Sequence, residues 1–238
     1  MPLSLRNEAD RANKMIRSTR TKLRLGCGVF CSVASCFQKS ERIVTSVFAI
    51  ALGQGALAQS IKAPPIPLAI QAPAGNVPFL QGQAAGTQNY ICLGSPSGFS
   101  WRFVGPQATL FFTFKLFKNE IRQQITTHFL SPNPTEGGTA RATWQSSIDT
   151  STVWGSAIAL SSDSNFVAPG AIPWLLLQVV GAQSGPTGGA FLTQTTFLQR
   201  LNTSGGVLPS TGCSQSSDIG ATAFVPYTAD YFFYKASQ

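Results

Sequence analysis

The feature that most constrains the fold is a series of short apolar runs separated by clusters of Gly, Pro and Ser. Gln88–Leu93 and Phe99–Val104 flank the turn-rich segment Gly94–Gly98, and they predict a hairpin. In Arg122–Leu130 apolar residues alternate with polar ones, which is the period of a half-buried strand. Ile172–Val180 is an almost continuous apolar run, and its short length favours a strand buried on both faces.

The remaining strands follow the same pattern, and neither a long helix nor an internal repeat is evident. Many short strands joined by Gly, Pro and Ser turns predict an all-β domain, either an antiparallel β-sandwich or a barrel. The further strands are expected within Thr109–Phe117, Arg141–Ser146, Thr152–Leu160 and Ala190–Leu201, and a final strand pair within Ile219–Tyr234.

The first 58 residues have the features of a leader with a signal peptide. Lys39 and Arg42 precede an apolar core, Ile43–Leu52, and Ala56-Leu57-Ala58 is the small-x-small pattern that a signal peptidase cleaves. The apolar run is too short for a membrane-spanning helix, which needs about 20 residues. We therefore expect cleavage after Ala58, a mature chain without a transmembrane helix, and a periplasmic or extracellular location.

An alternative processing site lies upstream. Val33-Ala34-Ser35-Cys36 resembles a lipobox, in which the cysteine is lipidated and becomes the new N-terminus. A lipoprotein cut there would carry a second export segment just inside its mature end, so we favour cleavage after Ala58. The mature chain is then expected to consist of a Pro-rich extended arm over residues 59–78 and one β-domain over residues 79–238.

The positive charge of the chain belongs mainly to the leader. The whole chain carries +8, but residues 1–42 hold nine Lys/Arg against three Asp/Glu, a net +6. Residues 43–238 therefore contribute only +2. Their densest cationic group, Lys115, Lys118 and Arg122, has Glu120 within it. We exclude nucleic-acid binding, which would need a basic patch.

Cysteine usage agrees with export. Cys92 and Cys213 are the only cysteines beyond the leader, an even number in a chain expected in an oxidising compartment. Neither lies in a CxxC motif or near a histidine, so a redox or metal role is not indicated. We predict a Cys92–Cys213 disulfide, and the alternative is two buried thiols.

Motifs for catalysis and cofactor binding are missing from the sequence. His128 is the only histidine, which excludes a His-rich metal site, and neither a phosphate-binding nor a dinucleotide-binding glycine motif is present. The weak catalytic candidates are His128, Asp230 and Arg200, and no metal or cofactor is expected.

Two interpretations of the C-terminal third remain open. Arg200 ends an apolar run and Asp230 lies between Tyr227 and Tyr231, so a buried Arg200–Asp230 ion pair would pin the last strand. Alternatively, these residues and the tyrosines line a pocket. Trp144, Tyr227 and Tyr231 are the weak binding candidates, although aromatic side chains are more often part of a core.

Three short motifs lie in the C-terminal third, at Pro173–Leu177, Thr203–Cys213 and Val225–Tyr234, and they follow the upstream positions Tyr90, Cys92, Trp101, Phe103, Pro106, Ala108, Leu110 and His128. Their order and spacing resemble an exported family known as domain of unknown function 3455. The resemblance extends from about Pro78 to Tyr234, and it implies an exported single domain with a shared disulfide but no assigned activity. This chain has a longer segment, Phe129–Ala142, between His128 and Thr143-Trp144, and Phe112–Asn119 replaces a short turn.

We therefore expect an exported β-domain that binds a small ligand or envelope component, or that has a structural role. Two alternatives are a secreted enzyme using His128 with a carboxylate, and an envelope protein lipid-anchored through Cys36.

Overall fold

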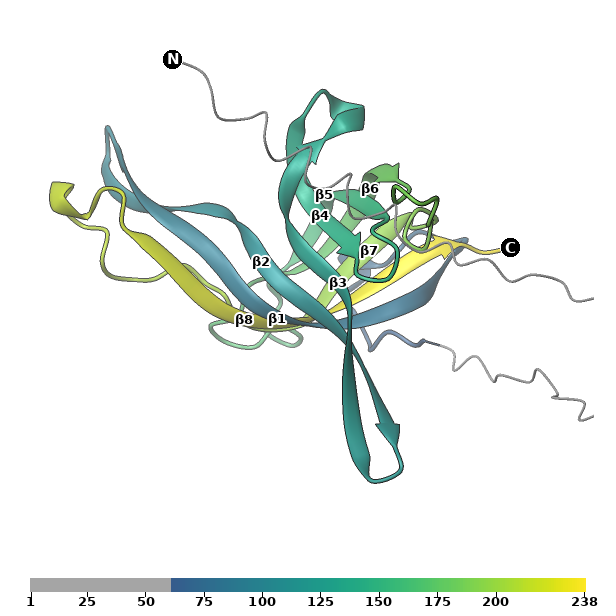
Figure 1. Cartoon of the computed structure of the whole chain (residues 1–238). Coiled ribbons are helices and arrows are strands. Elements are labelled where there is room, and N and C mark those ends of the chain that lie inside the picture. Colours follow the sequence, from purple (N-terminus) through teal and green to yellow (C-terminus); the bar gives the residue numbers. More distant parts are fainter. Residues whose placement is uncertain (1–60) are drawn as a thin grey trace, which may run out of the picture. The chain divides into compact units, whose positions relative to one another are not determined.

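The computed structural model describes residues 61–238, and in it eight antiparallel strands form a closed barrel (Figure 1). Each strand pairs with the next along the chain, and β1 closes the barrel by pairing with β8. The all-β prediction is confirmed, and the barrel is the correct one of its two architectures. The strands are β1 (Asn76–Ser95), β2 (Gly98–Leu116), β3 (Asn119–Asn133), β4 (Thr139–Ser146), β5 (Thr152–Ser161), β6 (Trp174–Gln183), β7 (Phe197–Gly205) and β8 (Thr222–Ala236).

Register shifts help the sheet to close. The β1–β2 ladder shifts between Asn89 and Tyr90, and the β5–β6 ladder shifts twice, between Trp154 and Gly155 and again between Ala157 and Ala159. A bulge of this kind bends a strand and increases its twist, which a closed barrel requires. Gly86 allows β1 and β2 to lie close together, because a Cβ atom there would lie 2.1 Å from the carbonyl oxygen of Gln107.

Three of the strand predictions need correction. The first hairpin forms, but its turn is Pro96–Ser97 and its strands are much longer than expected. The prediction of a final strand pair is wrong, because Thr222–Ala236 forms the single strand β8. Successive residues of β8 point alternately into the barrel and away from it. The strand predicted at Ala190 begins only at Phe197, since Ala190–Thr196 forms turns closed by backbone bonds such as Thr195 to Leu192.

The barrel interior holds the main hydrophobic core. Residues of alternating positions on all eight strands meet there, and Trp144, Leu110 and Phe233 are fully buried. The outside of β6, β7 and β8 carries a second cluster, in which Trp174, Leu176, Leu201, Phe232 and Tyr234 pack against Ile70 and Val167.

The Pro-rich segment covers that second cluster. Residues 61–72 contribute Ile61, Ile66 and Ile70, and a short 3-10 helix, η1 (Leu68–Ile70), shapes the contact. Gln199 fixes it by donating to the carbonyl oxygen of Ile70 at 2.6 Å. The first half of β6 is thus buried on both faces, with Leu177 inside the barrel and Leu176 beneath the arm.

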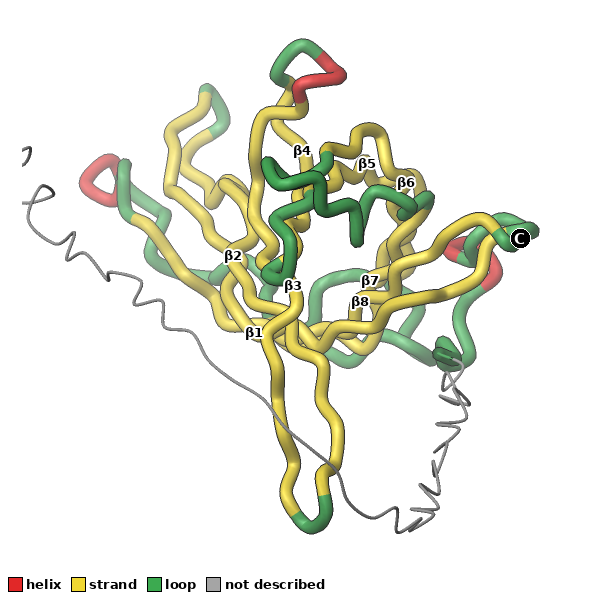
Figure 2. Tube along the Cα trace, turned by 45° about the vertical axis from the view of Figure 1, so that its right-hand side comes forward, coloured by secondary structure: helices red, strands yellow, loops and turns green. Residues whose placement is uncertain are grey.

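The end of β2 and the beginning of β3 project from the barrel as a two-stranded ribbon (Figures 1 and 2). Its turn exposes Phe117, which is 93% accessible and has a positive φ of 56°. Phe112 and Leu116 are also exposed on this ribbon, and Arg122 lies over the ring of Phe111 at 4.5 Å.

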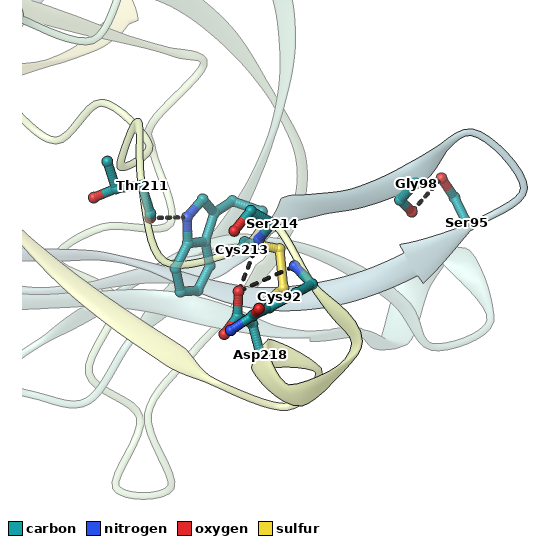
Figure 3. Close-up of a disulfide and its surroundings, with 9 residues drawn as sticks. Cys92, Ser95, Gly98, Thr211, Cys213, Ser214 and Asp218 are labelled. Atoms are coloured by element: carbon teal, nitrogen blue, oxygen red, sulfur yellow. Dashed lines mark hydrogen bonds between the residues drawn. A yellow bond between two sulfur atoms is a disulfide. The ribbon is translucent and has the colours of Figure 1, made fainter.

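The predicted disulfide joins Cys92 of β1 to Cys213 in the segment between β7 and β8 (Figure 3). Asp218 supports the cysteine loop by accepting backbone hydrogen bonds from Ser214 and Gln215. Trp101 donates from its indole nitrogen to the carbonyl oxygen of Thr211 at 2.9 Å. A long, otherwise irregular segment is thereby held against β1 and β2.

Two predictions concern membranes and export. Across residues 61–238, no helix has both the length and the apolar character needed to cross a membrane. The predicted signal peptide, its cleavage site at Ala58 and the alternative lipidated Cys36 lie outside the described residues.

Candidate functional site

A cavity of about 220 Å³ lies in the barrel interior, at one end of the main core. The polar and aromatic side chains on its wall include His128 from β3, Trp144 from β4, Arg200 from β7 and Tyr231 from β8. Directly paired residues of neighbouring strands share one face of a sheet. His128 therefore faces the interior together with Trp144, and Arg200 together with Tyr231. The rest of the wall is Gln88, Phe103, Pro106, Leu130, Ala140, Arg141, Ala142, Gly155, Ser156, Ala157, Leu175 and Leu177.

His128 is held as a neutral imidazole. Its ring stacks on Trp144 with centroids 4.3 Å apart and planes 9° from parallel. Its Nδ1 atom lies 2.9 Å from the carbonyl oxygen of Thr143, so Nδ1 carries the proton and donates it. Burial lowers the pKa of His128 to about 3, and the nearby Arg200 charge acts in the same direction.

Two tyrosines complete the aromatic group. Tyr231 lies edge-on to both rings, with centroids 5.2 Å from His128 and 5.6 Å from Trp144. The hydroxyls of Tyr227 and Tyr231 lie close together, with Gln88 beside the first and Arg200 beside the second, but none of these contacts has hydrogen-bond geometry. Burial raises the pKa of both hydroxyls, so both remain protonated and available as donors.

Arg200 brings a positive charge to the cavity wall without a carboxylate partner. One of its Nη atoms donates to the carbonyl oxygen of Pro173 at 2.8 Å. Its Nε atom is buried and has no partner. A guanidinium group has five N–H donors, and burying its charge unpaired is costly.

Buried polar atoms without a partner gather around this cavity. In residues 61–238 seven side-chain atoms are buried and unpaired, whereas most buried polar groups in proteins form hydrogen bonds. Four of them belong to residues on the cavity wall, and a fifth is the neighbouring Tyr227 hydroxyl. The four are Gln88 Nε2, Trp144 Nε1, Arg200 Nε and the Tyr231 hydroxyl.

The second arginine at the cavity differs from Arg200. Arg141 forms an ion pair with Glu136, with Nη2 and Oε1 2.7 Å apart, and its Nε also donates to Oε2. It donates to Ser156 Oγ as well. Glu136 lies in η2 (Pro134–Glu136), between β3 and β4. Arg141 is therefore neutralised, and the charge of Arg200 is the unmatched one.

The predicted Arg200–Asp230 ion pair is wrong. Among residues 61–238 the only ion pair is Arg141–Glu136. Asp230 accepts a hydrogen bond from Asn202 Nδ2 at 2.8 Å and lines a shallow depression on the outer face with Arg122. Arg200 faces inward with Tyr231, and the residue before Tyr231 in the strand must face outward.

The other carboxylates of residues 61–238 also lie away from the cavity wall. Asp149 accepts hydrogen bonds from the backbone N–H groups of Phe191 and Ser151. These bonds hold the segment between β6 and β7 against the β4–β5 turn. Despite the opposing effect of partial burial, these hydrogen bonds lower the pKa of Asp149 to about 2. Asp163 caps a turn through Asn165, and Asp218 supports the cysteine loop.

A larger hollow of about 720 Å³ lies over β1, β2 and β3. Of the polar side chains on it, Thr87 donates to Asn89 at 2.7 Å. None of the unpartnered buried atoms belongs to its lining residues. The interior cavity is therefore the better candidate site.

The comparison with protein families gives one match. Residues 73–235 match the model of a family described as Protein of unknown function (DUF3455). The chain belongs to this family. The match extends from the residues before β1 to Lys235 in β8, so it covers the barrel and both disulfide cysteines. Neither a curated protein nor a solved structure matches the chain.

In this DUF3455 barrel, the sequence candidates divide between the two faces of the sheet. His128, Arg200, Trp144 and Tyr231 lie together at the cavity, and Tyr227 is buried beside Tyr231. Asp230 is separated from them by the sheet itself. Within residues 61–238, no three side chains of the metal-binding types cluster together.

Gln88 is the site residue that the sequence analysis missed. It is 3% exposed, its amide nitrogen has no partner, and it neighbours the Tyr227 hydroxyl. The alternation of β1 could have revealed it, because Ala84, Gly86 and Gln88 share one face and Ala84 is a core residue.

Proposed function

We propose that this protein is an exported binding protein that holds a small molecule in the cavity of its barrel. The observation that carries the proposal is that four residues lining one cavity, Gln88, Trp144, Arg200 and Tyr231, each have a buried polar atom without a partner. Unpaired buried polar groups cost free energy, and they persist where a ligand or ordered water completes them.

The size of the cavity limits the ligand. A volume of about 220 Å³ has room for about seven water molecules at roughly 30 Å³ each. Pockets for drug-sized ligands begin at about 300 Å³. The ligand is therefore expected to be a small molecule rather than a polymer or a lipid tail.

Binding is favoured over catalysis by the state of His128. A general base needs a pKa near the working pH and a reachable partner, but the pKa of His128 is about 3 and the cavity wall carries no carboxylate. The stacked ring is better suited to forming a flat wall for a ligand. Export is supported by the leader sequence and by the disulfide, which persists in oxidising compartments.

A variant that fills the cavity tests the proposal without removing a polar group. Ala142 lies on the wall and packs against the core, so Ala142→Phe places a ring in the cavity. Ala85→Phe is the matched control, since it adds the same ring to an exposed position of β1.

Thermal shift would be measured for all three proteins against a library of small metabolites, both charged and neutral. We expect at least one compound to stabilise the wild type and Ala85→Phe but not Ala142→Phe. Circular dichroism would first confirm that Ala142→Phe is folded. Equal stabilisation of all three proteins would show that the cavity is not the site.

A further inference from the structure

We infer that the cavity selects a small monocarboxylate, whose carboxylate group is anchored by Arg200 and whose short apolar part lies against the leucines of the wall. This inference rests on the proposed function and names the chemical class of its ligand. It follows from the charge, the donors and the apolar lining of the cavity.

The charge of the wall is that of a single cation. Arg200 is unmatched, Arg141 is neutralised by Glu136, and His128 is neutral because of its burial. Asp and Glu are absent from the residues that line the cavity. One unmatched positive charge on a half-buried side chain favours a ligand with one negative charge.

The unpaired atoms are mainly donors. Arg200 Nε, Trp144 Nε1 and Gln88 Nε2 can only donate, and the protonated Tyr231 hydroxyl can donate as well. A carboxylate accepts hydrogen bonds at two oxygens and matches the fork of an arginine. A neutral ligand of the same shape would leave the Arg200 charge without a partner.

The remainder of the wall is apolar, which argues against a fully polar anion. Leu130, Leu175 and Leu177 line the cavity together with the stacked His128 and Trp144 rings. Phosphate or sulfate would satisfy Arg200 but would leave this apolar surface uncovered. A dianion would exceed the single unmatched charge.

The test compares butyrate with butyramide, which have nearly the same shape and differ in charge. Isothermal titration calorimetry at pH 7 is expected to show butyrate binding at least tenfold tighter than butyramide. Arg200→Met should abolish this preference. Arg200→Lys should restore part of it, because lysine keeps the charge but lacks the planar fork.

Arg102→Met is the matched control. It removes the same charge as Arg200→Met, but from an exposed position of β2 that does not line the cavity. Butyrate affinity should remain within about threefold of the wild type. Inorganic phosphate serves as a probe for simple anion attraction, and it should compete at least tenfold more weakly than butyrate.

Several outcomes would overturn the inference, and they separate it from the proposed function. Equal binding of butyrate and butyramide, or unchanged butyrate binding by Arg200→Met, would show that Arg200 does not select an anion. If neutral library compounds bind and Ala142→Phe abolishes their binding, the cavity is a site but not one for carboxylates. If Ala142→Phe weakens the binding of neither butyrate nor any library compound, both proposals fail.

Discussion

His128 and Trp144 stack face to face inside the barrel, with ring centroids 4.3 Å apart, although the sequence inserts a long segment between them. They face each other because the β3–β4 ladder pairs them directly. Residues added to a hairpin lengthen its tip, where η2 and the left-handed Gly137 reverse the chain. The ladder nearer the barrel keeps its register, so the stacked pair tolerates insertions beyond it.

His128→Gln should make the stability of the protein less sensitive to acid. The pKa of His128 is about 3 in the folded protein, mainly because of burial, against an ordinary value of 6.5. The unfolded chain therefore binds a proton first as the pH falls, and stability that is fully present above pH 6.5 is lost progressively down to pH 3. Between pH 7 and pH 5 this contributes about 2 kcal/mol.

Urea unfolding of the wild type and His128→Gln at both pH values measures this effect. The wild type should lose more free energy of unfolding than the variant between pH 7 and pH 5. The low pKa of Asp149, about 2, adds its own loss only at lower pH, so it does not interfere. Equal losses in the two proteins would mean that His128 is accessible to protons in the folded state.

Arg200→Met should leave the unliganded protein as stable as the wild type, or stabilise it by up to about 2 kcal/mol. The change removes one hydrogen bond to Pro173, and it also removes an unpaired charge from the cavity. Leu198→Ala, two residues away in the same strand and fully buried, should instead cost about 2–5 kcal/mol. A comparable loss in Arg200→Met would identify Arg200 as a structural residue.

The alternation of apolar and polar residues was enough to predict an all-β domain, and it also carried information that the sequence analysis did not use. Tyr227, Ala229, Tyr231 and Phe233 share the inner face of β8, so Asp230 between them must face outward. The expectation of an Arg200–Asp230 pair arose from the complementary chemistry of the two side chains rather than from this period. Gln88 on β1 was missed because the period was not applied to that strand.

Closure of the sheet could not be predicted in this way. The barrel depends on the pairing of β1 with β8 and on register shifts such as that between Asn89 and Tyr90. These are relationships between distant segments, and local composition does not specify them. The cavity could not be predicted either, because its lining residues come from all eight strands.

The disulfide should stabilise the barrel by about 2–4 kcal/mol. It closes a loop with a sequence separation of 121, and it anchors the segment between β7 and β8 to β1. Cys92→Ala/Cys213→Ala should lower the free energy of unfolding, measured in urea, by this amount. A reducing agent should reproduce the loss in the wild type and have no effect on the variant. A wild type unaffected by complete reduction would contradict the prediction.

Gly206→Ala should destabilise the protein and disturb the cavity together. Gly206 has a φ of 80°, and a Cβ atom there would lie 2.9 Å from Tyr227 Cβ and 3.0 Å from Gln88 Cγ. The left-handed backbone alone costs an alanine about 1–2 kcal/mol. Gly188→Ala is the matched control, because Gly188 has a similar φ of 86° but open space around it. The larger loss of thermal stability should occur at Gly206, and equal losses would exclude an effect of the contacts.

Phe117→Asn should stabilise the protein by about 0.5–1 kcal/mol. Phe117 is 93% exposed at the turn of the β2–β3 ribbon, so its ring gains little from burial. Its φ of 56° is costly for a bulky residue but is tolerated by asparagine. Phe112→Asn is the control, because Phe112 stacks on Phe114 with centroids 5.9 Å apart, and its loss should destabilise. Urea unfolding should show a higher midpoint at an unchanged m-value for Phe117→Asn. A lower midpoint would mean that the Phe117 ring makes a stabilising contact in solution.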